Sequence, residues 1–147
     1  MILAHNVKII YLAGPINSCT DEECKDWRAA AKKYFNHNSE EIGPIRVLDP
    51  MRRDYRGQEM SPHIRHLIVK GDKTDYRSAD ILLVYSPKPS YGTAMEMFDA
   101  YENLDKWVVV VNADEFPSPW LAEHCDYRVP TFELAFETIK GIIKEMQ

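Results

Sequence analysis

The chain has 147 residues, of which 45% are hydrophobic and 28% charged, and its formal net charge is -5. This length and composition predict one globular domain over residues 1–147, and the acidic balance disfavours nucleic acid, whose phosphates need a basic surface. No stretch approaches the ~20 apolar residues of a membrane span and the N-terminus lacks a basic signal-peptide region, so we expect a cytoplasmic protein with no membrane partner.

Four near-continuous apolar runs divide the chain, at 7–13, 45–49, 80–86 and 106–112. Strands that are apolar on both faces are typical of a buried, mostly parallel sheet. The segment 24–38 is predicted to be a helix because its large apolar residues fall on one stripe. The members of that stripe are Trp27, Ala30, Ala31, Tyr34 and Phe35.

A short strand is expected near 126–130, followed by a last helix that Pro130 and Thr131 open. The apolar stripe of this helix comprises Ala135, Ile139, Ile142, Ile143 and Met146. The order of elements predicts an α/β fold, a flavodoxin-like or Rossmann-like three-layer sandwich with a mostly parallel five-stranded sheet.

In such a fold, ligands bind beyond the carboxyl ends of the strands. The segments expected to meet there are 13–17, 49–53, 86–93 and 112–116. Two predicted loops, 50–63 and 112–126, are longer than a connection requires, and long loops in compact domains are often functional.

Cysteine and histidine give no sign of a metal site. Cys19, Cys24 and Cys125 are scattered and form no C-x-x-C pair, and the five histidines show no zinc-ligand spacing with them. His63 and His66 lie three residues apart and could share a helical face, but two solvated histidines are the commoner case. We therefore expect neither a structural metal nor a disulfide framework.

The helix predicted after the third strand carries a glutamate that can serve two purposes. Thr93 and Glu96 match a capping box, with Thr93 at the N-cap and Glu96 three residues into the helix. Alternatively, Glu96 points into the crevice, where the positive helix end would keep it ionised and able to attack an electron-poor carbon. The spacing does not show which direction the side chain takes.

Three aspartates precede the third predicted strand. Asp80 lies directly before the apolar run and is expected to cap or turn the chain. Asp72 and Asp75 are three residues apart, on neighbouring parts of a helix surface. Either they are solvated acids, which is the commoner case, or Asp72 points inward and supplies the second carboxyl group that glycosyl transfer needs.

The first strand and the first long loop contain further candidates. Tyr11 is either a core residue or a phenol that reaches the pocket, Gly14 allows close backbone approach, and Pro15 fixes the exit of the chain. The loop 50–63 gathers Arg52, Arg53 and Arg56. They are either solvated or recognise an anionic part of a substrate.

Together these segments resemble the nucleoside 2-deoxyribosyltransferase family, including its branch of 2′-deoxynucleoside 5′-monophosphate N-glycosidases. The resemblance runs from "IIYLAGPI" through "VLDP", "GDKTDYRSADILLVYS" and "PSYGTAMEM" to "KWVVVV". Its most specific part is a pair of blocks at the family's spacing, D-x7-D-I-L-L from Asp72 to Leu83 and S-x-G-T-A-M-E from Ser90 to Glu96.

The resemblance implies a flavodoxin-like fold and cleavage of an N-glycosidic bond with no metal or organic cofactor. By analogy, Glu96 would attack C1′ of the sugar and form a glycosyl-enzyme intermediate. Asp72 would contact the base and help deliver a proton to it, and Tyr11 matches a tyrosine near the catalytic glutamate. Water or a second base would then take the sugar from Glu96.

Ser90 favours a nucleotide substrate, because family members acting on free nucleosides have Asp at this position, whereas the nucleotide hydrolases have a Ser that binds the 5′-phosphate. The arginine of the hydrolases' first loop is missing from 15–21, and we expect Arg52, Arg53 or Arg56 to compensate. The expected substrate contacts are Gly14, Pro15, Ile16, Asn17, Asp49, Arg53, Ser90, Gly92, Thr93 and Ser118.

Family members also complete the pocket with a residue from a neighbouring subunit, and Ser118 is the nearest match here. The resemblance therefore implies a homodimer or a higher homo-oligomer. The predicted function is hydrolysis of (2′-deoxy)nucleoside 5′-monophosphates to the free nucleobase. The alternatives are base exchange on free 2′-deoxynucleosides and a non-catalytic nucleotide-binding module.

Overall fold

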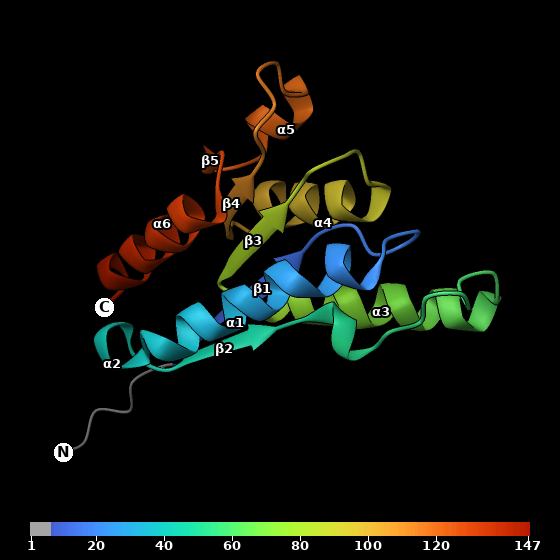
Figure 1. The fold of residues 1–147 in the computed structure, drawn as a ribbon, viewed down its shortest axis with the longest axis horizontal. Helices are drawn as coiled ribbons and strands as arrows, with labels where there is room; N and C mark the ends of the chain where they lie inside the picture. The colour runs from blue at the N-terminus through green and yellow to red at the C-terminus, as the bar shows by residue number, and fades with distance from the viewer. Residues whose placement is uncertain (1–6) are drawn as a thin grey trace.

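A computed structural model describes residues 7–147 and contains one five-stranded sheet (Figure 1). The strands are β1 (Lys8–Ala13), β2 (Ile45–Leu48), β3 (Ile81–Tyr85), β4 (Trp107–Val111) and β5 (Tyr127–Val129). Their order in the sheet is β2-β1-β3-β4-β5, and every pairing is parallel. This is the strand order of flavodoxin-like folds, so the predicted fold class is confirmed.

The helices and helical turns lie between the strands. They are η1 (Glu22–Asp26), α1 (Trp27–His37), α2 (Ser39–Ile42), η2 (Pro50–Arg52), α3 (Pro62–Ser78), α4 (Tyr91–Glu102), α5 (Pro119–Glu123) and α6 (Phe132–Glu145). The two long loops predicted at 50–63 and 112–126 thus contain the short helices η2 and α5. The predicted last helix is confirmed, with Thr131 as its N-cap accepting a hydrogen bond from the Leu134 amide at 3.2 Å.

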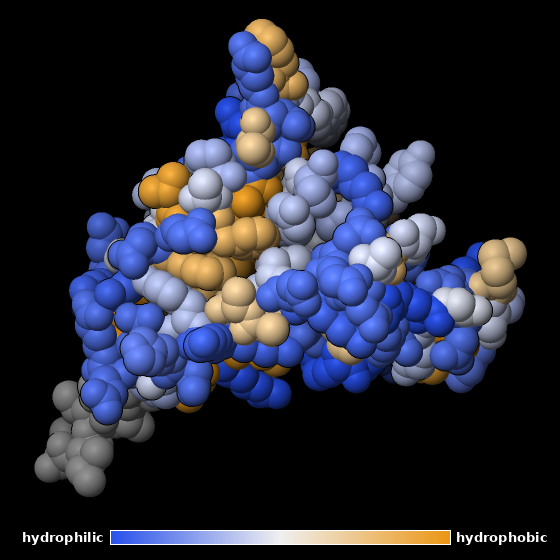
Figure 2. Space-filling view, viewed as in Figure 1, coloured by the Kyte–Doolittle hydropathy of each residue, from blue (hydrophilic) through white to orange (hydrophobic). Residues whose placement is uncertain are grey.

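Two apolar clusters pack on the two faces of the sheet. Ile10 and Leu12 of β1 contact α1 and α6, whereas Tyr11 and Ala13 face the layer that contains α3 and α4. This alternation explains why the strand is apolar throughout, since both of its faces are covered. In Figure 2, apolar surface is visible between α1 and α6 and also at the tip of the projecting segment around α5.

The stripe predicted for the first helix needs one correction. Ala30 is exposed, and Arg28 is instead fully buried. At 100° per residue, Arg28 and Ala30 lie on opposite edges of the face that Trp27, Ala31 and Phe35 form within α1. The sheet covers the edge with Arg28 and leaves the edge with Ala30 in solvent.

The position of the site follows from the strand order. The chain leaves β1 toward α1 on one face and leaves β3 toward α4 on the other, and these two strands are neighbours. A crevice opens where the two connections diverge, at the carboxyl ends of the strands. Within residues 7–147, no helix has the length and apolar character needed to cross a bilayer.

Candidate active site

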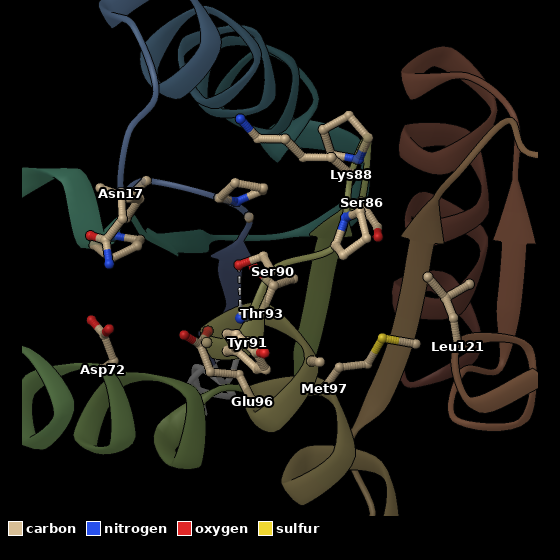
Figure 3. A pocket seen from close by; sticks show the side chains of 18 of the residues that line it. Asn17, Asp72, Ser86, Lys88, Ser90, Tyr91, Thr93, Glu96, Met97 and Leu121 are labelled. Carbon is tan, nitrogen blue, oxygen red and sulfur yellow. Dashed lines mark hydrogen bonds between the residues drawn. The ribbon is translucent and has the colours of Figure 1, made fainter. Parts of the chain in front are cut away.

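A cavity of about 1010 Å³ opens at the carboxyl edge of the sheet (Figure 3). The loops after β1, β2, β3 and β4 all line it, together with α3, α4 and α5. All the expected substrate contacts except Asp49 belong to this lining: Gly14, Pro15, Ile16, Asn17, Arg53, Ser90, Gly92, Thr93 and Ser118. The strand ends therefore bring together residues that lie more than one hundred positions apart.

Glu96 is not part of a capping box. Helix α4 starts at Tyr91, and its N-cap is Ser90, whose Oγ accepts a hydrogen bond from the Thr93 amide at 3.5 Å. Thr93 is thus the third residue of the helix and Glu96 the sixth, beyond the reach of the first-turn amides. The glutamate side chain lines the cavity instead, close to Thr93 and Tyr91 in Figure 3.

The carboxyl group of Glu96 is largely withdrawn from water. Its Oε2 atom is buried and has no hydrogen-bond partner in the described residues, while the side chain keeps partial exposure where it borders the cavity. Burial, reinforced by the charge of Asp72, raises the pKa of Glu96 to about 8, and the Tyr11 hydroxyl acts in the opposite direction. The expectation that the helix end keeps Glu96 ionised is therefore wrong, because Glu96 lies past the first turn in a dry environment.

Asp72 supplies a second acid in the same cavity. It projects from α3 toward the cavity and lies on the same side as Glu96 in Figure 3. Burial raises its pKa, and the guanidinium of Arg53, 3.3 Å away, acts in the opposite direction. Asp75 is buried outside the lining and bonds Arg52 and Arg53, so the two aspartates that the spacing could not separate have different environments.

Tyr11 lies behind the cavity wall rather than in it. Its side chain is fully buried and packs against Tyr76 with ring centroids 6.0 Å apart. Burial, followed by the charges of Glu96 and Asp72, raises the pKa of Tyr11 well above its usual value, so the phenol stays protonated and can donate. Tyr11 thus supports Glu96 from the core and is not part of the cavity lining.

The arginines of the loop 50–63 form ion pairs with carboxylates of the same chain. Arg53 bonds Asp72 and Asp75 through Nη2, at 3.3 and 2.8 Å. Arg56 bonds Asp54 and Asp21, and these bonds raise its pKa further. Arg53 and Arg56 both line the cavity, and their carboxylate partners are groups that neither of the two alternatives left open by the sequence had included.

Asp49 has a structural role that its strand-end position does not reveal. Its Oδ1 accepts a hydrogen bond from the Met51 amide at 2.8 Å and lies 3.5 Å from Nε of the buried Arg28. Arg28 in turn donates to the carbonyl of Gly14 at 3.1 Å, which places a buried cation directly under the cavity floor. Asp49 lies outside the cavity lining, where it holds the Met51 amide and Arg28 rather than a substrate.

Ser118, expected to reach the pocket of a neighbouring subunit, lines the cavity of its own chain. The same wall contains Trp120 and Leu121 of α5, which the sequence suggested for a subunit interface or for burial within one subunit. It also contains His124 and Phe98, which the sequence gave no reason to select. The Trp120 and His124 rings are stacked 5.5 Å apart. Flat rings in the lining of a cavity that also holds two acids suit a ligand with an aromatic base.

The cavity thus offers two carboxyl groups, a buried phenol behind them and an aromatic wall, an arrangement suited to acid-assisted displacement at a carbon atom. Among residues 7–147, no group of three or more His, Cys, Asp or Glu is placed to hold a metal ion.

The fold and the cavity can be compared with known structures. A 2-deoxyribosyltransferase from the psychrotolerant bacterium Bacillus psychrosaccharolyticus matches with a TM-score of 0.66 and 20% sequence identity, over 90% of each chain. This chain has the fold of that enzyme. A conserved protein from Enterococcus faecalis V583 matches with a TM-score of 0.67 and 14% identity, over 97% of this chain and all of the other.

No protein-family model matches the chain, and no curated protein matches it by sequence. The structural match to the 2-deoxyribosyltransferase confirms, at the level of the fold, the resemblance inferred from the sequence motifs.

Proposed function

We propose that this chain belongs to the nucleoside 2-deoxyribosyltransferase family and hydrolyses the N-glycosidic bond of (2′-deoxy)nucleoside 5′-monophosphates. The observation that carries the proposal is the carboxyl group of Glu96, which faces a large cavity with one oxygen unpartnered and a second acid, Asp72, beside it. A buried polar group without a partner is costly for a fold to keep. A role toward a bound sugar explains why it is kept.

In the first step, an ionised carboxylate oxygen of Glu96 attacks C1′ of the sugar. The bond between C1′ and the base nitrogen breaks, and its electron pair goes to the base. Asp72 and Glu96 share one proton in the reactive state: with Glu96 ionised, Asp72 holds this proton and gives it to the departing base, which leaves neutral. The products of this step are the free base, an ester between Glu96 and C1′, and an ionised Asp72.

In the second step, water attacks C1′ of the ester. The bond from C1′ to Glu96 breaks, and its electron pair restores the glutamate carboxylate. Asp72 takes a proton from the water and regains its starting state. The sugar phosphate leaves with a hydroxyl group on C1′.

The other groups support this chemistry. The protonated phenol of Tyr11 lies behind Glu96 and lowers the pKa of Glu96, which favours the ionised form that attacks. Ser90 caps α4 through its oxygen lone pair, so its hydroxyl hydrogen remains for a substrate phosphate. Phe98, Trp120 and His124 form a wall on which a base could stack.

Base exchange on free 2′-deoxynucleosides is the second candidate. The enzyme from B. psychrosaccharolyticus that shares this fold is a 2-deoxyribosyltransferase, and Arg53 and Arg56 are already occupied by carboxylates. Incubation with each deoxynucleoside and each monophosphate, with and without a second base, separates the two reactions by product. Free base from monophosphates alone supports hydrolysis, and a new nucleoside formed only with added base supports exchange.

The variant Glu96→Ala tests both reactions and distinguishes them from nucleotide binding without turnover. Replacing Glu96 with Ala removes the nucleophile and should abolish turnover while binding persists. Turnover at the wild-type rate in Glu96→Ala would refute the mechanism. Binding of nucleotides by the wild-type chain without release of base would leave only a binding module.

We also propose that the active form is a homodimer or a higher homo-oligomer in the cytoplasm. Tyr91, Met95 and Phe98 form an exposed stripe along α4, and Phe116 and Trp120 are exposed on the projecting segment around α5. Tyr91, Phe98 and Trp120 also line the cavity, so a second copy covering this face would close it. Light scattering should give a multiple of 17.1 kDa for the wild-type chain and a smaller mass for Met95→Glu.

A further inference from the structure

The cations that line the cavity differ in how fully they are already bound. They are Arg53, Arg56 and Lys88. Arg53 faces Asp72 and Asp75, and Arg56 holds Asp21, Asp54 and the carbonyl of Cys19. Both guanidinium groups are neutralised within the chain, so a ligand anion would have to displace a carboxylate to reach them.

Lys88 is different. Its ammonium group makes no hydrogen bond within residues 7–147, and its nearest carboxylate, Oε2 of Glu23, lies 3.8 Å away with both side chains about half exposed. Glu23 is also occupied elsewhere, because its Oε1 accepts from the Thr20 amide at 3.1 Å in a capping box at the start of η1. An exposed pair at this distance is weak, so the charge of Lys88 is available to a ligand.

The position of Lys88 suits an anion bound together with the sugar. Figure 3 shows its side chain along one edge of the cavity with Ser90 below it, while Asp72 and Glu96 lie on the opposite side. Pro87 and Pro89 flank the lysine and restrict the backbone that carries it. The hydroxyl hydrogen of Ser90 is free to donate from beneath.

We infer that Lys88 is the residue that recognises an anionic group on the 5′ side of the sugar and so makes the site specific for nucleotides. This inference rests on the proposed function. In a furanose, C1′ and the C5′ substituent lie on opposite sides of the ring oxygen, so a sugar with C1′ at Glu96 directs its 5′ group away from the two acids. Lys88 and Ser90 occupy that side, where a phosphate escapes repulsion by Asp72 and Glu96.

The test compares a deoxynucleoside 5′-monophosphate with its matching deoxynucleoside on three variants. Lys88→Gln should raise KM for the monophosphate about tenfold or more, as expected for loss of a charged hydrogen bond, and leave KM for the nucleoside unchanged. Lys33→Gln removes the same charge from an exposed position on α1 and should change neither value. Glu23→Gln keeps the capping box but removes the competing carboxylate, so it should lower KM for the monophosphate.

Calorimetric titration of the same ligands separates this inference from the proposed reaction. Tighter binding of the monophosphate than of the nucleoside, lost in Lys88→Gln, supports the role of Lys88 even if no base is released. Turnover with equal affinity for both ligands, or with a monophosphate affinity unchanged in Lys88→Gln, overturns the role of Lys88 while leaving the reaction intact.

Discussion

The guanidinium of Arg53 lies against the backbone of Gly71, where a Cβ atom on the glycine would come 2.8 Å from Nε and 3.0 Å from Cζ. Only the absence of a side chain in the middle of α3 lets Arg53 lie along the helix and reach Asp72 and Asp75. The glycine is unfavourable for the helix by about 0.5–1 kcal/mol, and the ion pairs that it permits offset that cost.

Replacing Gly71 with Ala should therefore destabilise the protein, although alanine is the better helix former. Displacing Arg53 from the buried Asp75 should cost about 1–3 kcal/mol, more than the helix gains. Gly141, in the middle of α6, has no atom within 4 Å of its Cβ position and is the matched control. Chemical denaturation should show Gly141→Ala stabilised by about 0.5–1 kcal/mol. Equal stabilisation of Gly71→Ala and Gly141→Ala would show that the contact between Arg53 and Gly71 does not hold Arg53 in place.

Replacing Glu96 with Gln should stabilise the protein in a pH-dependent way. The native pKa of Glu96 is about 8, against an ordinary value of 4.5. Between these values the native state binds one more proton than the unfolded state, so the unfolding free energy falls as the pH rises. The unfolding free energy of the glutamine variant does not fall in this way. Between pH 5 and pH 9 it should therefore rise by on the order of 3 kcal/mol relative to that of the wild type.

Thermal unfolding across that pH range is the measurement. Glu102→Gln makes the same substitution at an exposed position at the end of the same helix, and its stability should depend on pH as that of the wild type does. If the two glutamine variants behave alike, the native state does not bury the carboxyl group of Glu96.

The rate of glycosidic cleavage should fall as the pH rises above about 8. Attack needs Glu96 ionised and Asp72 protonated, so the two carboxyl groups together must hold one proton, and they lose it as the pH passes the raised pKa of Glu96. We expect kcat/KM to fall about tenfold per pH unit above that value. In Asp72→Asn only the ionisation of Glu96 is needed, so the maximal rate should be lower and the falling limb should disappear. A falling limb that remains in Asp72→Asn would show that Asp72 is not the acid.

The two duties of Ser90 can be separated by substitution. Glycine is an acceptable N-cap, so Ser90→Gly should cost only a few tenths of a kcal/mol in stability while removing the hydroxyl that faces the ligand. We expect a higher KM for the monophosphate and little change for the nucleoside. Thr131→Ala removes the cap of α6, far from the cavity, and should cost about 1 kcal/mol without a kinetic effect. An unchanged monophosphate KM in Ser90→Gly would limit Ser90 to its capping role.

The sequence identified the strands, the fold class and most of the cavity lining. Burial on both faces leaves a continuous apolar run that can be read without coordinates, and the alternation of strands and helices indicates a parallel sheet with right-handed connections. The strand ends then place Gly14, Ser90 and Glu96 at one edge of the sheet, whatever their separation along the chain.

Tertiary structure alone decided where side chains point and what they meet. The local pattern allowed Thr93 to cap the helix, but the chain enters α4 one turn earlier, at Ser90, and leaves Glu96 facing the cavity. Nothing local distinguishes Asp72 from Asp75, or Lys88 from Arg53, because their partners are contributed by other segments. The order of residues along the chain determines the apolar periodicity of its helices and strands. The direction, burial and charge state of a side chain depend instead on neighbours that only the folded chain brings within a few ångströms.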